Sequence, residues 1–279
     1  MHQNIVQLEW LAQRLGEPDV VVADCRFNLG NPNEGKQAYQ AGHIPGAIFF
    51  DLEEDLSSPV GVHGGRHPLP DLETFIRKLG MRGIGGETTV VAYDDQGGTM
   101  ASRLWWMLQF LGHDRVYVLE RGFSAWKSAG YPVTIDLPEL REREFTGSAR
   151  TDMLASMEEV KALSMRPEAA LIDSREAGRY KGLFEPIDPV AGHIPGALNY
   201  FWKDNLREDG TWKSPEELRR RFVGLSDSEE IAVYCGSGVS ACPNVLALRE
   251  AGFRNVKLYA GSWSDWISYP DNRIATGEE

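Results

Sequence analysis

Ala41-Gly42-His43-Ile44-Pro45-Gly46-Ala47 recurs without change at residues 191–197. The segments around this motif are also repeated in the same order, with similar rather than identical residues. The further pairs are residues 22–26 with 171–175, 90–93 with 231–234, and 122–126 with 261–266. Four matches in one order, so far apart along the chain, indicate duplication of a whole domain rather than a short solenoid repeat.

Length and composition agree with two domains of ordinary size. The chain has 279 residues, of which 42% are hydrophobic and 25% are charged, as in soluble globular proteins. We expect a first domain over residues 1–137, a linker over 138–153 and a second domain over 154–279. The linker begins with a charged run, and Phe145 within it predicts an ordered strap rather than a free tether.

Both domains are predicted to be of the α/β class. Short segments rich in β-branched residues alternate with helical segments, which is typical of mostly parallel sheets flanked by helices. The predicted strands include residues 20–22, 116–119, 231–234 and 256–259. The predicted helices include residues 5–15, 71–79, 101–111, 157–164, 215–222 and 242–251. Ligands of such sheets bind beyond the carboxyl ends of the strands, so a site is expected there.

Charge and cysteine content exclude several classes of partner. The formal net charge of -12 argues against nucleic acid or an anionic membrane surface as a partner. No segment has the ~18 apolar residues of a membrane helix, and the N-terminus lacks the features of a signal peptide. The cysteines are few and lack the spacing of metal ligands. We therefore expect a cytoplasmic protein without a metal or a cofactor.

The segment Cys235-Gly236-Ser237-Gly238-Val239-Ser240-Ala241 is the strongest candidate for a reactive site. It joins a predicted strand to a predicted helix, so backbone N–H groups and a helix N-terminus point at one sulfur. Such surroundings favour the nucleophilic thiolate and can hold a second sulfur or an oxyanion. The alternative is a buried structural cysteine. Cys25 is assigned to the core and Cys242 to packing, with resolution of an oxidised Cys235 as the alternative for Cys242.

Over nearly its whole length the chain resembles the two-domain rhodanese-like sulfurtransferases. The resemblance rests on the two His-Ile-Pro-Gly-Ala motifs, the Cys235 loop, residues 173–180 and the terminal residues 259–266. It implies two rhodanese folds, of which only the second is catalytic. The family's cysteine takes a sulfane sulfur from a small anionic donor and becomes a persulfide. It then passes the sulfur to cyanide, a thiol or a thioredoxin-like acceptor.

The first domain lacks the reactive cysteine. Asp94 follows Tyr93 at the position where the second domain has Cys235 after Tyr234. A carboxylate cannot replace a thiolate in sulfur transfer. We therefore expect the first domain to be a non-catalytic partner that helps to wall the site.

The composition of the loop bears on the donor. Family members that prefer thiosulfate resemble Cys-Arg-x-Gly-x-x, whereas those that prefer 3-mercaptopyruvate resemble Cys-Gly-Ser/Thr-Gly-Val-Thr-Ala. This chain differs from the second pattern only at Ser240. The resemblance favours 3-mercaptopyruvate as donor, with thiosulfate as the alternative. It implies that the loop residues bind the donor, namely Gly236, Gly238, Val239 and Ser240.

Two arginines are candidates for binding the carboxylate of that donor. Arg175 and Arg179 are four positions apart, the spacing that places both on one side if this stretch is helical. Guanidinium groups pair with carboxylates in a bidentate manner. Both also match arginines that the family uses for substrate. The alternative for each is a structural salt bridge.

Proton transfer is assigned by the resemblance. In the mercaptopyruvate branch a loop serine, a histidine of the first domain and a carboxylate act together, and the corresponding residues here are Ser237, His43 and Glu34. Histidine exchanges protons near neutral pH. Because both copies of the repeat carry a histidine, a structural role for His43 is the alternative. His63 and His67 lie in a loop that is longer in the first domain, but their spacing does not require a role at the site.

Two other functions compete with sulfur transfer from a small donor. Cysteine phosphatases share the loop architecture but need an arginine six residues after the cysteine, where this chain has Ala241. Phosphatase activity is therefore not expected. A persulfide relay, loaded on Cys235 by a partner protein, differs from an enzyme because it does not turn over a small donor.

Overall fold

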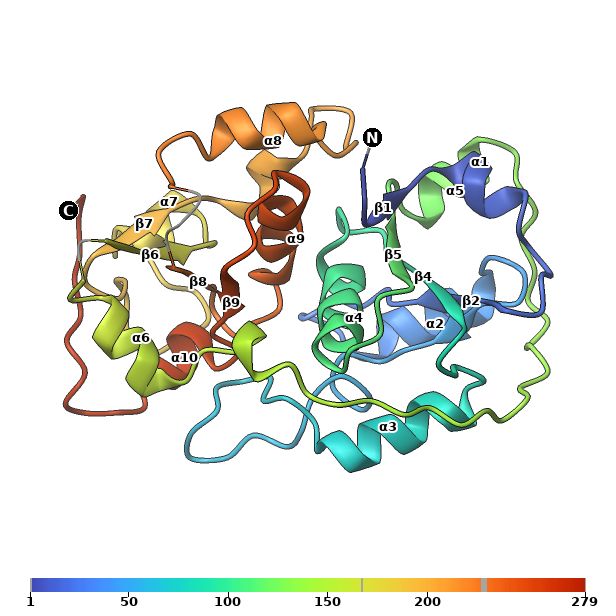
Figure 1. The fold of residues 1–279 in the computed structure, drawn as a ribbon, viewed down its shortest axis with the longest axis horizontal. Coiled ribbons are helices and arrows are strands. Elements are labelled where there is room, and N and C mark those ends of the chain that lie inside the picture. The colour runs from blue at the N-terminus through green and yellow to red at the C-terminus, as the bar shows by residue number, and fades with distance from the viewer. Residues whose placement is uncertain (1, 167, 227–229, 279) are drawn as a thin grey trace.

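The structure, a computed structural model, describes residues 2–166, 168–226 and 230–278. Two lobes lie side by side, each built around a parallel sheet (Figure 1). The first lobe contains the blue and green segments, and the second contains the yellow to red segments. The predicted α/β class with two tandem domains is confirmed.

The first sheet is parallel and has the strand order β1-β5-β4-β2-β3. Its strands are β1 (Ile5–Val6), β2 (Val20–Asp24), β3 (Ile48–Phe49), β4 (Thr89–Tyr93) and β5 (Val116–Leu119). In the central pair, Val20 lies opposite Thr89 and Asp24 lies opposite Tyr93. Apolar residues run almost without interruption along these strands because helices cover both faces of the sheet.

The second sheet repeats this arrangement with the order β7-β6-β8-β9. Its strands are β6 (Ala169–Asp173), β7 (Ala197–Asn199), β8 (Glu230–Tyr234) and β9 (Val256–Leu258). Asp173 lies opposite Tyr234, as Asp24 lies opposite Tyr93 in the first sheet. The strand register therefore reproduces the repeat in the sequence.

Helices flank both sheets. They are α1 (Leu8–Ala12), α2 (Asn33–Ala41), α3 (Leu72–Met81), α4 (Thr99–Phe110), α5 (Phe123–Ser128), α6 (Met157–Leu163), α7 (Ala177–Tyr180), α8 (Pro215–Arg221), α9 (Cys242–Glu250) and α10 (Ser262–Trp266), with 3-10 turns η1 (Thr151–Met153) and η2 (Trp202–Asn205). The predicted helices agree with α3, α4, α6, α8 and α9 to within two residues at each end. Capping boxes at Ser156 and Ser214 explain the sharp starts of α6 and α8. Among the described residues, no helix combines the length and the apolar character needed to cross a bilayer.

The helix predicted over residues 5–15 is wrong at its N-terminal end. Ile5–Val6 form β1 and pair with Val118 and Leu119, and the helix is limited to Leu8–Ala12. Both residues of β1 are β-branched, and pairing with β5 adds them to the edge of the sheet. Tertiary contacts therefore override the helical pattern of the local sequence.

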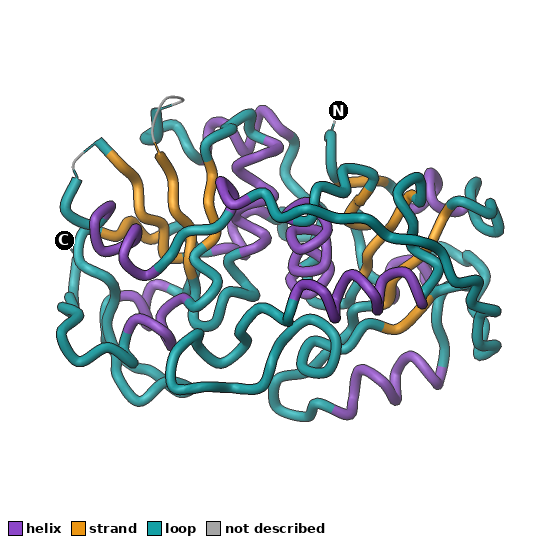
Figure 2. Tube along the Cα trace, turned by 60° about the horizontal axis from the view of Figure 1, so that its bottom comes forward, coloured by secondary structure: helices purple, strands orange, loops and turns teal. Residues whose placement is uncertain are grey.

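The inner helices α4 and α9 join the two lobes. Figure 2 shows purple helices between the two groups of orange strands. Every residue of α4 except Gln109 is buried, and every residue of α9 except Arg249 is buried. Helices that are buried all round belong to a core. One apolar cluster accordingly runs from Trp106 in the first lobe to Leu246 in the second.

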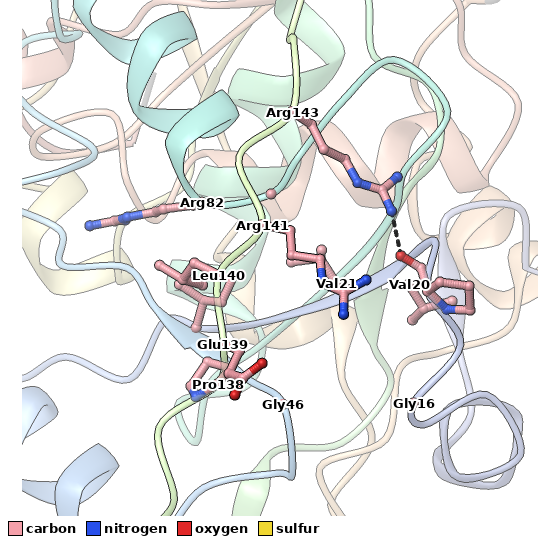
Figure 3. Close-up of a pocket in the computed structure, with 13 residues that line it drawn as sticks. Gly16, Val20, Val21, Gly46, Arg82, Pro138, Glu139, Leu140, Arg141 and Arg143 are labelled. Carbon is pink, nitrogen blue, oxygen red and sulfur yellow. Dashed lines mark hydrogen bonds between the residues drawn. The ribbon is translucent and has the colours of Figure 1, made fainter.

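The segment between the lobes runs along the surface as an ordered strap, as predicted. The Arg143 amide donates to the Gly80 carbonyl at 3.0 Å, and Phe145 is only 6% exposed. A pocket of about 430 Å³ lies against this strap. Figure 3 shows Arg141 and Arg143 among the residues that line it. The pocket does not include the Cys235 loop. The domain boundaries at either end of the strap stay predictions.

Candidate active site

Cys235 lies directly after β8, at the carboxyl end of a central strand, and is 1% exposed. The Gly238 N–H donates to the Cys235 Sγ at 3.2 Å, and the Ser262 hydroxyl lies 4.0 Å from the same sulfur. Ser262 Oγ also accepts a hydrogen bond from the Cys235 amide at 3.0 Å, which fixes the backbone. The Gly238 N–H can therefore stabilise an anion on this sulfur, whereas the Ser262 hydroxyl donates to the Tyr259 carbonyl at 2.9 Å.

The loop after Cys235 depends on its glycines. Gly238 has a φ of +76°, and a Cβ at this position would lie 2.1 Å from the Ala260 carbonyl oxygen, so only glycine fits. The loop ends where α9 begins, with Pro243 in the first turn, where its missing N–H has no cost. Val239 is buried and Ser240 is half-buried. Strand, loop and helix follow one another as predicted.

A histidine from the first lobe contacts this loop. His67 Nδ1 lies 2.8 Å from Ser237 Oγ, and both side chains are buried. Burial lowers the pKa of His67 to about 4, and the charges of Arg103 and Arg66 act in the same direction. The imidazole is therefore neutral at pH 7. It can exchange a proton with the Ser237 hydroxyl. The tautomer of the ring decides whether Nδ1 donates or accepts in this hydrogen bond.

The segment that carries this histidine, residues 63–67, docks on α10. The Gly64 amide donates to the Asp265 carboxylate at 2.7 Å. A Cβ at Gly65 would lie 2.3 Å from the Gly261 carbonyl oxygen, so this close approach requires glycine. Figure 1 shows the pale-blue segment before α3 reaching beneath the second lobe toward α10. The first lobe thus contributes side chains to the surroundings of Cys235.

Two guanidinium groups lie beside the backbone of Gly236. A Cβ at Gly236 would be 2.8 Å from Nη2 of Arg66 and 3.4 Å from Nη2 of Arg179. Asp188 holds both arginines, with Arg66 Nε at 2.9 Å and Arg179 Nη2 at 3.4 Å from its oxygens. Arg179 also pairs with Glu185 at 2.7 Å. The two arginine side chains remain 28% and 15% exposed, so each can bind a small anion from the solvent side.

Arg175 is linked to this pair through Glu185, whose carboxylate lies 3.3 Å from Nη1 of Arg175. Its side chain is buried, and Nη2 donates to Asp173 at 2.6 Å and to the glycine carbonyl of the repeated motif at 2.7 Å. Although burial opposes its charge, Asp173 raises the pKa of Arg175 above its usual range. In the first lobe, Arg26 makes the same two bonds, to Asp24 at 2.6 Å and to the motif glycine at 2.7 Å. These contacts favour the structural salt bridge, the alternative for Arg175, because the same bridge holds the repeated turn in both lobes; donor binding by Arg175 stays a prediction.

His43 also lies away from the loop. Its Nδ1 is 2.8 Å from the Tyr39 carbonyl oxygen, and its Nε2 is 3.1 Å from the Asp136 carbonyl oxygen. In the second lobe, His193 Nδ1 lies 2.7 Å from the Tyr180 carbonyl oxygen in the same way. These contacts favour a structural role for His43, and its role as a proton relay stays a prediction. Its ring fastens the repeated turn, which was the alternative that the duplication left open.

Asp94 occupies the place of Cys235 in the first lobe. Its two carboxyl oxygens accept backbone N–H groups at 2.8 to 3.0 Å from Gln96, Gly98, Met100 and Ala101. Burial raises the pKa of Asp94, against the lowering effect of these amides. The backbone N–H groups at the start of α4 therefore bind a side chain of the same loop. This loop has no thiol, and its N–H groups are not free to bind an anion.

The other cysteines are neutral thiols. Burial raises the pKa of Cys242 to about 12 and that of Cys25 well above its usual range. The Cys242 thiol donates to the Gly238 carbonyl at 3.3 Å, and Cys25 lies in the core of the first lobe. Within the described part of the chain, no group of three or more histidine, cysteine or acidic side chains could hold a metal ion.

The sequence did not identify the residues that the first lobe contributes to the site. The carboxylate expected to assist the histidine, Glu34, is exposed and accepts a hydrogen bond from Asn28 at 2.8 Å. Arg66 and His67, by contrast, reach the Cys235 loop. Their only signal in the sequence was the extra length of the loop around residues 62–68 relative to its copy in the second domain.

Comparison with known proteins gives consistent results for both lobes. The model of the Rhodanese-like domain family matches residues 7–129 and 156–269. A probable 3-mercaptopyruvate sulfurtransferase of Pseudomonas aeruginosa is 47% identical over 281 residues, with 99% of each protein covered. A thiosulfate sulfurtransferase of Mus musculus is 35% identical, with 100% of this chain and 97% of the relative covered. The crystal structure of SseA from Escherichia coli, described among the 3-mercaptopyruvate sulfotransferases, superposes with a TM-score of 0.81. It shares 35% identity, over 93% of this chain and 98% of that one.

Proposed function

The chain belongs to the rhodanese-like sulfurtransferases, and we propose that it transfers a sulfane sulfur from 3-mercaptopyruvate to a thiol or to cyanide through a persulfide on Cys235. Arg66 and Arg179 would hold the donor, and Ser237 with His67 would handle the proton. The thioredoxin-like acceptor and the cytoplasmic location stay predictions.

The observation that carries this proposal is the pair of guanidinium groups beside Gly236. The donor has a carboxylate next to a ketone, and its sulfur is on the following carbon. A carboxylate bound by Arg66 and Arg179 would leave that sulfur free to meet Cys235. Because the loop itself has no basic side chain, recognition of the carboxylate falls to these two residues.

In the first half-reaction, the Cys235 thiolate attacks the sulfur of the bound donor. An S–S bond forms as the C–S bond breaks, and the electron pair of the broken bond passes to the carbon, which gives the enolate of pyruvate. One proton then converts the enolate to pyruvate. We assign delivery of this proton to the Ser237–His67 pair, whose hydrogen bond of 2.8 Å lies within the range of proton transfer.

In the second half-reaction, the acceptor attacks the outer sulfur of the Cys235 persulfide. The S–S bond breaks and its electron pair returns to Cys235 as the thiolate. Cyanide leaves as thiocyanate, and a thiol leaves as a new persulfide, while the proton of the outer sulfur is released to solvent. The Gly238 N–H, which contacts the Cys235 sulfur at 3.2 Å, would stabilise the negative charge before and after transfer.

Thiosulfate is the competing donor, since a relative with 35% identity is named for it. Attack on its outer sulfur would release sulfite, which leaves as an anion and needs no proton. With thiosulfate, the Ser237–His67 pair would therefore not be needed to deliver a proton to the leaving group. This difference separates the two donors experimentally.

The test compares kcat/KM for 3-mercaptopyruvate and thiosulfate, each with cyanide as acceptor. We expect at least about a tenfold preference for 3-mercaptopyruvate. Cys235→Ser should abolish transfer from both donors, whereas Cys25→Ser and Cys242→Ser, the matched controls, should keep most of it. A preference for thiosulfate would overturn the donor assignment. Activity that survives in Cys235→Ser would overturn the persulfide mechanism, and stoichiometric loading without turnover would indicate a relay.

A further inference from the structure

Arg103 on α4 is a fully buried arginine that links the first lobe to the Cys235 loop. Its side chain is 0% exposed. Nη1 donates to the Gly238 carbonyl at 3.1 Å, and Nη2 donates to the carbonyls of His67 at 3.1 Å and Leu56 at 3.3 Å. One guanidinium therefore contacts both the loop of the reactive cysteine and the segment that carries the histidine.

The charge of Arg103 has no carboxylate partner among the residues that the structure describes. Its hydrogen bonds go to carbonyl oxygens, and its Nε has no acceptor. A buried guanidinium stays protonated, and burial without a counter-charge is unfavourable. Arg26 and Arg175, which are also buried, each pair with an aspartate. An anion near Arg103 is therefore to be expected in the working protein.

Two sulfurs lie beside the Arg103 guanidinium, that of Cys242 and that of Cys235. The Cys235 sulfur accepts from the N–H of Gly238 at 3.2 Å, the residue whose carbonyl Arg103 contacts. Burial raises the pKa of Cys242 to about 12, so this thiol is neutral at pH 7. Its hydrogen is directed to the Gly238 carbonyl, which also accepts from Arg103. Cys235 is then the group that can supply the missing negative charge.

We propose that Arg103 is a positioning residue that supplies, from the non-catalytic lobe, the positive charge that stabilises the anionic sulfur of Cys235. This inference rests on the proposed function of Cys235 as the sulfur-carrying nucleophile. The same charge would act on the thiolate before transfer and on the persulfide anion after it. The first lobe would thus take part in the electrostatics of the reaction rather than only wall the site.

Other titratable groups also face the Cys235 loop. They are His67 from the first lobe, Cys242 from α9, and the cluster of Arg66, Arg179 and Asp188. His67 titrates near pH 4 and Cys242 near pH 12, so neither interferes with a measurement near neutral pH.

The experiment measures the rate of Cys235 alkylation by iodoacetamide as a function of pH, with the modified residue identified by mass spectrometry. The variants are Arg103→Met, which removes the charge, and Arg103→Lys, which keeps it. Arg77→Met, on the exposed side of α3, is the matched control. We expect the pH midpoint of alkylation to rise by about one unit or more in Arg103→Met, by less than half of that in Arg103→Lys, and not at all in Arg77→Met.

An unchanged midpoint in a folded Arg103→Met protein would overturn the proposal, even if turnover falls, because it would indicate that Arg103 only holds the three carbonyls in place. Alkylation needs no sulfur donor, so it stays informative if sulfur transfer itself is not observed. A second measurement covers the case in which Arg103→Met does not fold. It repeats the alkylation on Arg103→Gln, which keeps N–H donors but has no charge. The midpoint should rise in this variant too, and an unchanged midpoint would contradict the proposal.

Discussion

The imidazole of His67 and the hydroxyl of Ser237 lie 2.8 Å apart, although 170 residues and the border between the lobes separate them along the chain. Each residue is buried, at 5% and 7% exposure. The pair exists only because residues 63–67 dock on α10. The first domain, which has Asp94 at the position of Cys235, therefore supplies part of the site that the second domain builds around Cys235.

The first prediction concerns the donor that needs a proton. Ser237→Ala and His67→Gln should each lower kcat with 3-mercaptopyruvate by about 100-fold, since proton delivery by a positioned pair contributes on this order. Turnover with thiosulfate should stay within about threefold, because sulfite leaves without a proton. Steady-state kinetics with both donors checks the split.

The double variant Ser237→Ala with His67→Gln supplies the control for this prediction. Residues that act as a unit are not additive, so the double variant should be no slower than the slower single one. His43→Gln should lower the Tm and leave kcat per folded protein nearly unchanged. Equal losses with both donors would argue against a role in proton transfer.

The second prediction is a pH dependence of stability that His67 causes. Its pKa is about 4 in the folded protein and about 6.5 when unfolded. The unfolded chain therefore binds more protons between these values, and the contribution of His67, complete above about pH 6.5, is lost as the pH falls toward 4. This should cost about 2 kcal/mol of unfolding free energy between pH 7 and pH 5.

Urea unfolding of the unchanged protein and of His67→Gln at both pH values measures this contribution. Glutamine does not titrate, so the unfolding free energy of His67→Gln should fall less between the two pH values than that of the unchanged protein. Parallel losses in the two proteins would mean that His67 is not buried as a neutral ring.

The overall fold could be predicted because its signals are local. β-Branched runs, capping serines and the exact repeat of residues 41–47 and 191–197 are visible in the sequence, and they account for both sheets and most helices. The edge strand β1 was missed because its partner, β5, is more than a hundred residues away. Pairing between strands so far apart cannot be read from the hydrophobic pattern of a short segment.

The site could be predicted where the second domain builds it, which includes the Cys235 loop and Arg179. Cys235 and Ser237 lie in a single strand–loop–helix unit, whereas Arg66 and Arg103 reach that unit from another domain. The duplication favoured a structural role for Arg175, since its copy Arg26 belongs to the lobe that lacks the reactive cysteine. A residue type that both copies need is more readily explained by the shared fold than by catalysis.

The third prediction separates the two arginines first assigned to the donor. Arg179→Met should raise KM for 3-mercaptopyruvate by at least about tenfold, because it removes a charge-assisted bond to the carboxylate. Arg175→Met should instead lower the unfolding free energy by about 3 to 5 kcal/mol, because it leaves Asp173 buried without its partner.

Arg66→Met is the companion of Arg179→Met and should shift KM in the same direction. Arg26→Met is the companion of Arg175→Met, and it should destabilise the protein while KM stays the same. Kinetics and urea unfolding on the four variants test both assignments. An unchanged KM in Arg179→Met would remove that residue from donor binding.

The fourth prediction concerns Asp94, the counterpart of Cys235. Asp94→Asn replaces one acceptor oxygen with an NH₂ group that faces backbone N–H groups, so two donors meet in a buried place. The expected cost is about 2 to 4 kcal/mol of unfolding free energy. Because the Asp94 loop has no thiol to activate, kcat/KM per folded protein should stay within about twofold. Asp95→Asn, whose carboxylate is exposed, is the matched control and should cost less than about 1 kcal/mol. A large loss of transfer at unchanged stability would mean that the Asp94 loop acts on the reaction directly.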